Sequence, residues 1–124
     1  MLLFAKDLPT LVDFYAAAFG LTPVASSDAG YVALTDGQDT MLAVHAIPAD
    51  IADTIVIGSP PGFRDDVAIK PCFVTDDLGA ARRAIVDHGG QAKEPWAWEG
   101  TLYCECSDPE GNVLQVLQPG GAPP

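Results

Sequence analysis

Apolar residues recur at helical spacing in two stretches of the chain. In residues 9–19 they fall on one face of a helix, and Gly20 is placed to end that helix in a left-handed conformation. The apolar positions of this face are Leu11, Phe14, Tyr15, Ala18 and Phe19. A second helical stretch covers residues 78–88 and stops at Gly90. The pattern therefore predicts two helices, at about 9–19 and 78–88.

Most of the remaining sequence consists of short apolar or alternating runs bounded by turn residues, which is typical of β-strands. One strand is expected before each helix, at 2–6 and 67–75. Three strands are expected after each helix, at 22–27, 31–35 and 40–46 in the first half and at 91–96, 101–107 and 112–118 in the second half.

The two halves also resemble each other in sequence. Leu3–Leu8 aligns with Phe73–Leu78, and Tyr31–Asp36 aligns with Tyr103–Asp108. Such self-similarity at a fixed spacing indicates a duplicated unit. Each copy has a strand, a helix and three strands, so the chain is expected to hold two tandem βαβββ modules.

A sheet with one helix leaves its other face uncovered, so neither module is expected to stand alone. We predict an α+β fold in which the two modules form curled mixed sheets around a cavity, with the helices outside. The chain, 1–124, is expected to be a single domain with module one at 1–46, a linker at 47–66, module two at 67–118 and a tail at 119–124. Residues 51–57 of the linker have the composition of a short irregular element.

Composition narrows the possible partners and the compartment. The net charge of −11 argues against nucleic acid and against anionic membrane as partners, and is compatible with a cationic small molecule. The N-terminus has no basic region, and no apolar run is long enough to span a membrane. Three cysteines without paired spacing, Cys72, Cys104 and Cys106, favour a reducing compartment. We therefore expect a cytoplasmic protein.

Several motifs resemble those of the vicinal oxygen chelate superfamily of glyoxalases, bleomycin-resistance proteins and extradiol dioxygenases. In module one these are Asp13-Phe14-Tyr15 and Phe19-Gly20-Leu21. In module two they are Thr75–Leu78 and the Asp-Pro-Glu-Gly-Asn turn at 108–112, which precedes an apolar strand. The resemblance covers both modules and implies the same fold, a homodimer and a small-molecule ligand.

The resemblance also implies a divalent metal held by one residue from each of four strands. Carried onto this sequence, the first ligand position falls before Met1 and the others fall on Ala43, Lys70 and Gln115. A methyl group cannot ligate, an ammonium is cationic and an amide is a poor substitute for a carboxylate. We therefore predict no metal cofactor. The alternative is a divalent metal such as Zn, Ni, Fe or Mn in an altered site that includes His45 and Glu105.

Two tryptophans within three residues, Trp96 and Trp98, indicate either a ligand wall or core packing. Pro95-Trp96 is similar to a Pro-Trp pair of bleomycin-resistance members, which are metal-free dimers that sequester a cationic antibiotic. Lys70 and Glu105 are expected to form a salt bridge or to bind polar ends of a ligand. The predicted ligand-binding residues are Phe4, Tyr31, His45, Lys70, Trp96, Trp98, Tyr103, Glu105 and Gln115, and no residue is assigned a catalytic or metal-binding role.

Three functions fit these features. The first is metal-independent binding of a small aromatic or cationic ligand in the sheet cavity. The second is a metal-dependent lyase or dioxygenase with a non-standard ligand set. The third is an enzyme of the same fold that uses no metal. The missing metal ligands favour the first.

Overall fold

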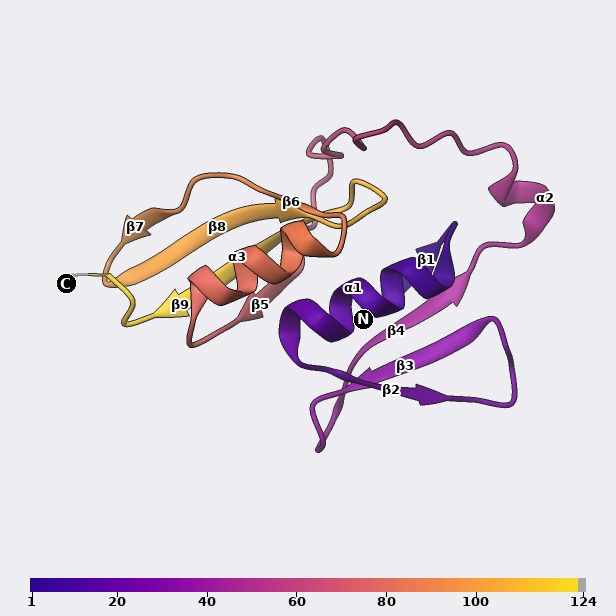
Figure 1. The fold of residues 1–124 in the computed structure, drawn as a ribbon, viewed down its shortest axis with the longest axis horizontal. Coiled ribbons are helices and arrows are strands. Elements are labelled where there is room, and N and C mark those ends of the chain that lie inside the picture. The colour runs from indigo at the N-terminus through magenta and orange to yellow at the C-terminus, as the bar shows by residue number, and fades with distance from the viewer. Residues whose placement is uncertain (123–124) are drawn as a thin grey trace.

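The computed structural model describes residues 1–122 and contains two modules that follow each other along the chain, a βαβββ module and a βαββββ module (Figure 1). Module one consists of β1 (Leu2–Ala5), α1 (Leu8–Phe19), β2 (Thr22–Ala25), β3 (Tyr31–Thr35) and β4 (Thr40–Ala46). Module two consists of β5 (Cys72–Val74), α3 (Leu78–Asp87), β6 (Gln91–Ala92), β7 (Trp96–Trp98), β8 (Thr101–Ser107) and β9 (Val113–Pro119). A short helix, α2 (Ala49–Ala52), lies in the long connection between them.

Each module forms one mixed sheet. The strand order is β1-β4-β3-β2 in module one and β5-β9-β8-β6 in module two, where β7 also pairs with β8. The first strand of each module runs parallel to the last one, and the other pairs are antiparallel. The predicted α+β fold of two mixed sheets is confirmed. The sheets stay separate, because no backbone ladder within residues 1–122 joins β1 to β5.

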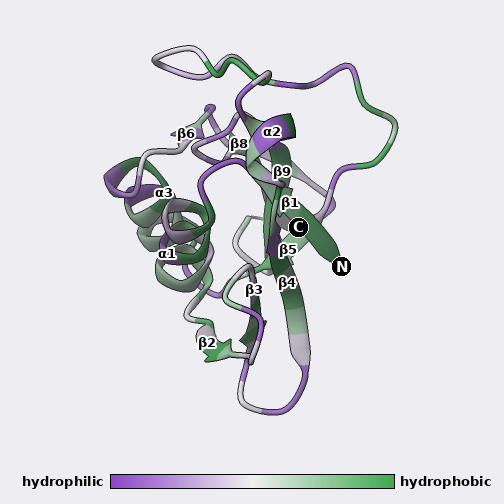
Figure 2. Cartoon of the chain, turned by 90° about the vertical axis from the view of Figure 1, so that its right-hand side faces the viewer, coloured by the Kyte–Doolittle hydropathy of each residue, from purple (hydrophilic) through white to green (hydrophobic). Residues whose placement is uncertain are grey.

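The two long helices, α1 and α3, cover the same side of the sheets. Figure 2 shows α1 and α3 together on one side, with the strands of both sheets in a layer beside them. Within residues 1–122, no helix covers the opposite face of either sheet, as the sequence pattern predicted. These two uncovered faces are called the open faces below.

Local sequence explains where the helices begin and end. The Asp7 carboxylate accepts a hydrogen bond from the Thr10 N–H at 3.2 Å, and the Asp77 carboxylate accepts one from the Ala80 N–H at 2.9 Å. Both bonds satisfy an amide that has no partner inside its helix. Gly20 ends α1 with φ at 63°, a left-handed conformation that glycine adopts without steric cost.

The modules share one hydrophobic core, which lies between the helices and the sheets. Phe73 of β5 stacks on Phe19 of α1 with ring centroids 4.1 Å apart, and it lies 5.8 Å from the ring of Tyr15. Phe14, Tyr15 and Ile85 are buried in the same core. Each module therefore covers apolar surface that the other would leave in water.

The Asp-Pro-Glu-Gly-Asn turn also ties module two to module one. Buried Asp108 accepts a hydrogen bond from the Tyr15 hydroxyl at 2.8 Å. The Glu110 carboxylate accepts from the backbone N–H groups of Lys6 and Asp7, at 2.9 and 2.8 Å. Burial raises the pKa of Asp108, and its hydrogen bonds to Asn112 and Tyr15 act in the opposite direction. The motif that marked the family resemblance thus holds the start of α1 in place.

Proline positions account for the differences from the predicted strands. The strand expected at 67–75 is reduced to Cys72–Val74, because Pro71 has no N–H to donate and Ile69 before it is exposed. The strand expected at 91–96 ends at Ala92, and β7 begins only after Pro95. The irregular linker element expected at 51–57 overlaps α2 at residues 51–52 only, and residues 55–57 belong to no helix or strand.

No helix in residues 1–122 is long and apolar enough to cross a membrane.

Candidate functional site

The predicted ligand-binding residues of module one lie together on its open face. Phe4 pairs with His45 across the β1–β4 ladder, and Tyr31 pairs with His45 across the β3–β4 ladder. The His45 ring centroid lies 5.7 Å from that of Phe4 and 6.1 Å from that of Tyr31. Nδ1 of His45 lies 2.8 Å from the Ala46 carbonyl oxygen, so a hydrogen bond fixes the ring. These three side chains form one aromatic cluster.

The tryptophans form a second aromatic group, on the open face of module two. Trp96 pairs with Tyr103 across the β7–β8 ladder, and their rings stack with centroids 5.5 Å apart and planes 14° apart. The Trp98 ring centroid lies 6.3 Å from that of Tyr103. Trp96 and Trp98 are 44% and 61% exposed, so neither packs in the core of the chain. Trp96, Trp98 and Tyr103 are called the aromatic wall below.

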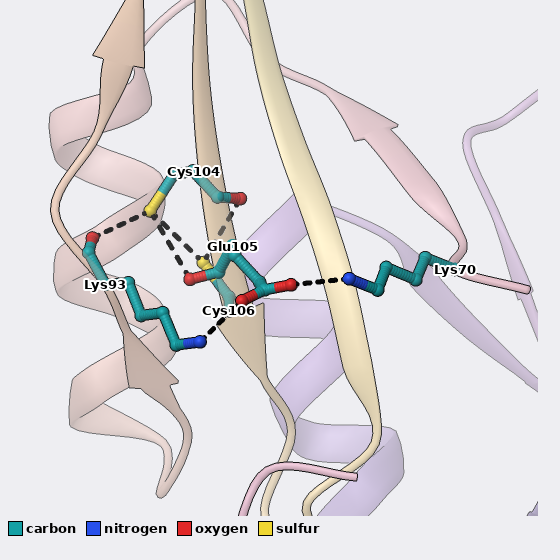
Figure 3. Close-up of polar contacts among 5 residues, drawn as sticks. All are labelled: Lys70, Lys93, Cys104, Glu105 and Cys106. Carbon is teal, nitrogen blue, oxygen red and sulfur yellow. Dashed lines mark hydrogen bonds and ion pairs between the residues drawn. The ribbon is translucent and has the colours of Figure 1, made fainter. Parts of the chain in front are cut away.

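Beside the aromatic wall, Glu105 binds two lysines (Figure 3). Its Oε1 lies 2.7 Å from the Lys70 ammonium, so the salt bridge that the sequence suggested is present. Its Oε2 lies 2.6 Å from the Lys93 ammonium. The hydrogen bonds from Lys70 and Lys93 hold the pKa of Glu105 below its usual value, so the carboxylate stays ionised. Gln115 faces the same side of the sheet, opposite Glu105 on β9.

Sequence reasoning missed Lys93. It lies between β6 and β7, within the strand expected at 91–96, which the structure interrupts before Pro95. One signal was available in the order of the predicted strands. If the strand at 91–96 pairs antiparallel with the strand at 101–107, a residue near position 93 lies opposite Glu105. The Lys93 N–H donates to the Glu105 carbonyl oxygen at 2.9 Å, and this bond places the two side chains next to each other.

The cysteines of β8 point to the other side of the strand. Cys104 and Cys106 are fully buried beneath α3, with their Sγ atoms 3.5 Å apart, and both are free thiols. Glu105 between them faces the open side, as alternation along a strand requires (Figure 3). β8 therefore has a buried side that faces the helices and an open side that carries Glu105.

The positions that the family resemblance assigns to a metal carry no suitable donor set. The Ala43 N–H donates to Met1 O, and the Gln115 N–H donates to Pro71 O, both at 2.9 Å, so the two modules place Ala43 and Gln115 equivalently. The Ala43 side chain is a methyl group and the Gln115 side chain ends in an amide, while the Lys70 ammonium is held by Glu105. Within residues 1–122, no three His, Cys, Asp or Glu side chains are grouped to hold an ion. The residues present do not fit the family's divalent metal.

A sequence model of the glyoxalase-like domain family matches residues 1–117. The chain belongs to this family. The glyoxalase-like domain is part of the superfamily that the motifs of both modules resembled, so that resemblance is confirmed. A search of curated proteins finds no match to the sequence.

Solved structures share the glyoxalase-like fold over almost the whole chain. A glyoxalase/bleomycin resistance protein/dioxygenase family enzyme from Burkholderia phytofirmans PsJN is 19% identical, with a TM-score of 0.70 over 95% of this chain and 94% of that one. A bleomycin-binding protein complexed with bleomycin is 24% identical, with a TM-score of 0.60 over 94% and 93%. The antibiotic-binding protein TnmS3 from Streptomyces sp. CB03234 is 19% identical, with a TM-score of 0.63 over 96% and 92%. At these identities the likeness establishes the fold.

The structure therefore divides the predicted residues of this glyoxalase-like domain into two groups. Phe4, Tyr31 and His45 lie on one sheet, and the aromatic wall with Lys70, Glu105 and Gln115 lies on the other. No ring contact or hydrogen bond within residues 1–122 joins the two groups. A hollow of about 460 Å³ lies at the junction of the sheets and is lined by Met1, Phe19, Leu21, Asp36, Met41, Pro71, Cys72, Phe73 and Val74. None of the predicted ligand-binding residues lines this hollow.

Proposed function

We propose that this glyoxalase-like domain binds a small aromatic ligand on its open faces without a metal. The observation that carries the proposal is the exposed aromatic wall. Indole rings bury a large apolar area when they stack on a ligand, and they are costly to leave in water without such a partner. The wall stands beside charged side chains, which is the combination that ligand sites use for affinity and orientation.

The donor set supports the proposed metal independence. A Lewis-acid mechanism needs several nitrogen, sulfur or carboxylate donors around one ion. Ala43, Lys70 and Gln115 supply none of these at the positions where the family holds its metal. Binding by stacking and hydrogen bonds needs no ion.

We also propose that a second copy of the chain completes the site. The open face of module one exposes large apolar side chains, which are Leu2, Phe4, Val24 and Met41. An uncovered apolar face of this kind favours association, and a twofold contact would cover it in both copies at once. Such a homodimer would also enclose the aromatic wall and make the cavity that one chain does not close.

Two structural neighbours support a binding role. One is described as a bleomycin-binding protein in complex with bleomycin, and another as an antibiotic-binding protein. Those properties belong to the neighbours. They support the proposal for this chain because the same fold, in both cases, accommodates an organic ligand.

The test is a fluorescence titration of chelator-treated protein with uncharged planar aromatics such as naphthalenemethanol. Trp96 and Trp98 are the only tryptophans of the chain, so quenching reports on the proposed site. Trp96→Leu and Trp98→Leu should each weaken binding by ~0.5–2 kcal/mol, which is about twofold to thirtyfold, because one stacking face is lost.

The matched control is Val56→Ala, an apolar truncation in the exposed linker that should leave affinity unchanged. Thermal melting of Trp96→Ala separates a binding role from a core role. An exposed ring should cost little stability, whereas a core tryptophan would cost ~3–5 kcal/mol. Absence of quenching by every probe, or collapse of the fold in the tryptophan variants, would contradict the proposed function.

A further inference from the structure

The charged groups beside the aromatic wall present cations to an incoming ligand. Both carboxylate oxygens of Glu105 already accept a lysine ammonium, and the Glu105 side chain is 15% exposed. The lysine side chains are more accessible, at 32% for Lys70 and 48% for Lys93. An ammonium has three N–H donors, so each lysine keeps donors that Glu105 does not use. A ligand approaching this side of the sheet therefore meets hydrogen-bond donors before it meets the carboxylate.

Neighbouring groups hold the two ammonium groups in place. The Phe63 ring lies with its centroid 4.6 Å from the Lys93 Nζ, a cation–π contact on a second side of that ammonium. The Glu105 hydrogen bond raises the pKa of Lys93, and Asp65 adds to this effect at longer range without forming an ion pair within residues 1–122. Lys93 therefore stays cationic at neutral pH.

The lysines lie on the same side of the sheet as the aromatic wall. Glu105 follows Tyr103 by two residues on the same face of β8, a separation of about 7 Å along a strand. Lys93 precedes Trp96 on the neighbouring segment and lies beside Glu105. A planar ring stacked on the exposed Trp96 would therefore lie on the same side of the sheet as both ammonium groups.

We infer that the ligand of this site is an aromatic acid, whose ring stacks on the aromatic wall and whose carboxylate accepts hydrogen bonds from Lys70 and Lys93. The inference rests on the proposed function and names the chemical class of its ligand. An aromatic acid replaces the cationic ligand that the net charge of −11 suggested. The two lysines act on the ligand at hydrogen-bond distance, whereas the net charge is spread over the surface and screened by salt. In this arrangement Glu105 has the role of positioning the two lysines.

The test compares three probes that share one ring system and differ in charge: naphthoate, naphthalenemethanol and naphthylmethylammonium. Naphthoate should bind the wild-type protein about threefold or more tighter than the alcohol, as a partly exposed charged contact allows, and the ammonium should bind more weakly than either. Lys93→Met and Lys70→Met should each reduce this preference, measured as the ratio of the dissociation constants for the alcohol and for naphthoate. Lys93→Arg should restore it, because a guanidinium also donates to a carboxylate.

Arg83→Met is the matched control, because it removes the same charge from the exposed face of α3, on the other side of the sheet. It should leave the preference for naphthoate intact. Equal binding of naphthoate and the alcohol, or tighter binding of the ammonium, would overturn the aromatic-acid inference while the proposed function stands. No binding of any of the three probes would overturn both.

Discussion

The hydrogen bond between Tyr15 and Asp108 joins the two modules, and Tyr15→Phe removes that bond alone. The Tyr15 side chain is 1% exposed, and its hydroxyl donates to Asp108 Oδ2 at 2.8 Å. The phenylalanine ring would keep the packing against Phe14 and Phe73, so no large cavity forms. Asp108 Oδ2 would retain one donor, the Asn112 Nδ2 at 2.8 Å. A buried hydrogen bond to a charged group contributes ~1.5–3 kcal/mol, and we expect that loss in the free energy of unfolding.

Urea unfolding of Tyr15→Phe measures this loss directly. The midpoint should fall while the denaturant slope stays unchanged, because the folded structure and its buried area are the same. The pKa of Asp108 is already raised by burial, and losing the Tyr15 bond raises it further. The defect should therefore be largest where Asp108 is ionised and should shrink as pH falls. Tyr31→Phe is the matched control, because the Tyr31 hydroxyl makes no hydrogen bond within residues 1–122. A loss below ~0.5 kcal/mol, or a defect that grows in acid, would refute the reasoning.

Three further predictions concern packing, charge and assembly. Gly90→Ala should destabilise the protein by about 3 kcal/mol in urea unfolding, because a Cβ at this position would clash with the Ser107 carbonyl oxygen and lie 2.6 Å from Phe14 Cε2. Gly62→Ala is the control and should be neutral, because its Cβ would meet nothing within 4 Å. Glu105→Gln should lose stability at pH 7. Its deficit relative to wild type should begin to shrink below about pH 4 and should disappear only once pH has fallen through the lowered folded-state pKa of Glu105, because the stabilisation is complete above the unfolded pKa and is lost as the folded carboxylate is protonated. Sedimentation equilibrium at micromolar concentration should give a homodimer, and a monomer would contradict the proposed second copy.

Local signals in the sequence account for the elements that were predicted correctly. Helical spacing, the Asp7 cap and Gly20 define α1 within one residue of the expected start. The strand expected at 101–107 is β8, and the alternation of its side chains puts Tyr103 and Glu105 on one side and the buried cysteines on the other. These features depend on residues that are close in sequence, so the spacing of apolar and polar residues is enough to predict them.

Contacts between distant residues account for what the sequence did not predict. The stacking of Phe19 on Phe73 helps to set how the two modules pack, and nothing in the sequence around either residue indicates that the two rings are in contact. Lys93 contacts Glu105 because it continues the pairing of β6 with β8, and the sequence around Lys93 does not show which residue it pairs with. The cavity expected between curled sheets is not closed by one chain, because the helices bring the modules together and leave both open faces on the other side (Figure 2).

The central claim is that this glyoxalase-like domain binds an aromatic ligand without a metal. The most direct test is calorimetric titration of chelator-treated protein with naphthalenemethanol, repeated after loading with zinc, nickel, iron(II) or manganese(II), with elemental analysis of each sample. We expect the same dissociation constant within about twofold in every sample, because Ala43, Lys70 and Gln115 offer no site that would couple an ion to the ligand. Binding that appears only after loading, or one equivalent of metal in protein purified without chelator, would contradict the account.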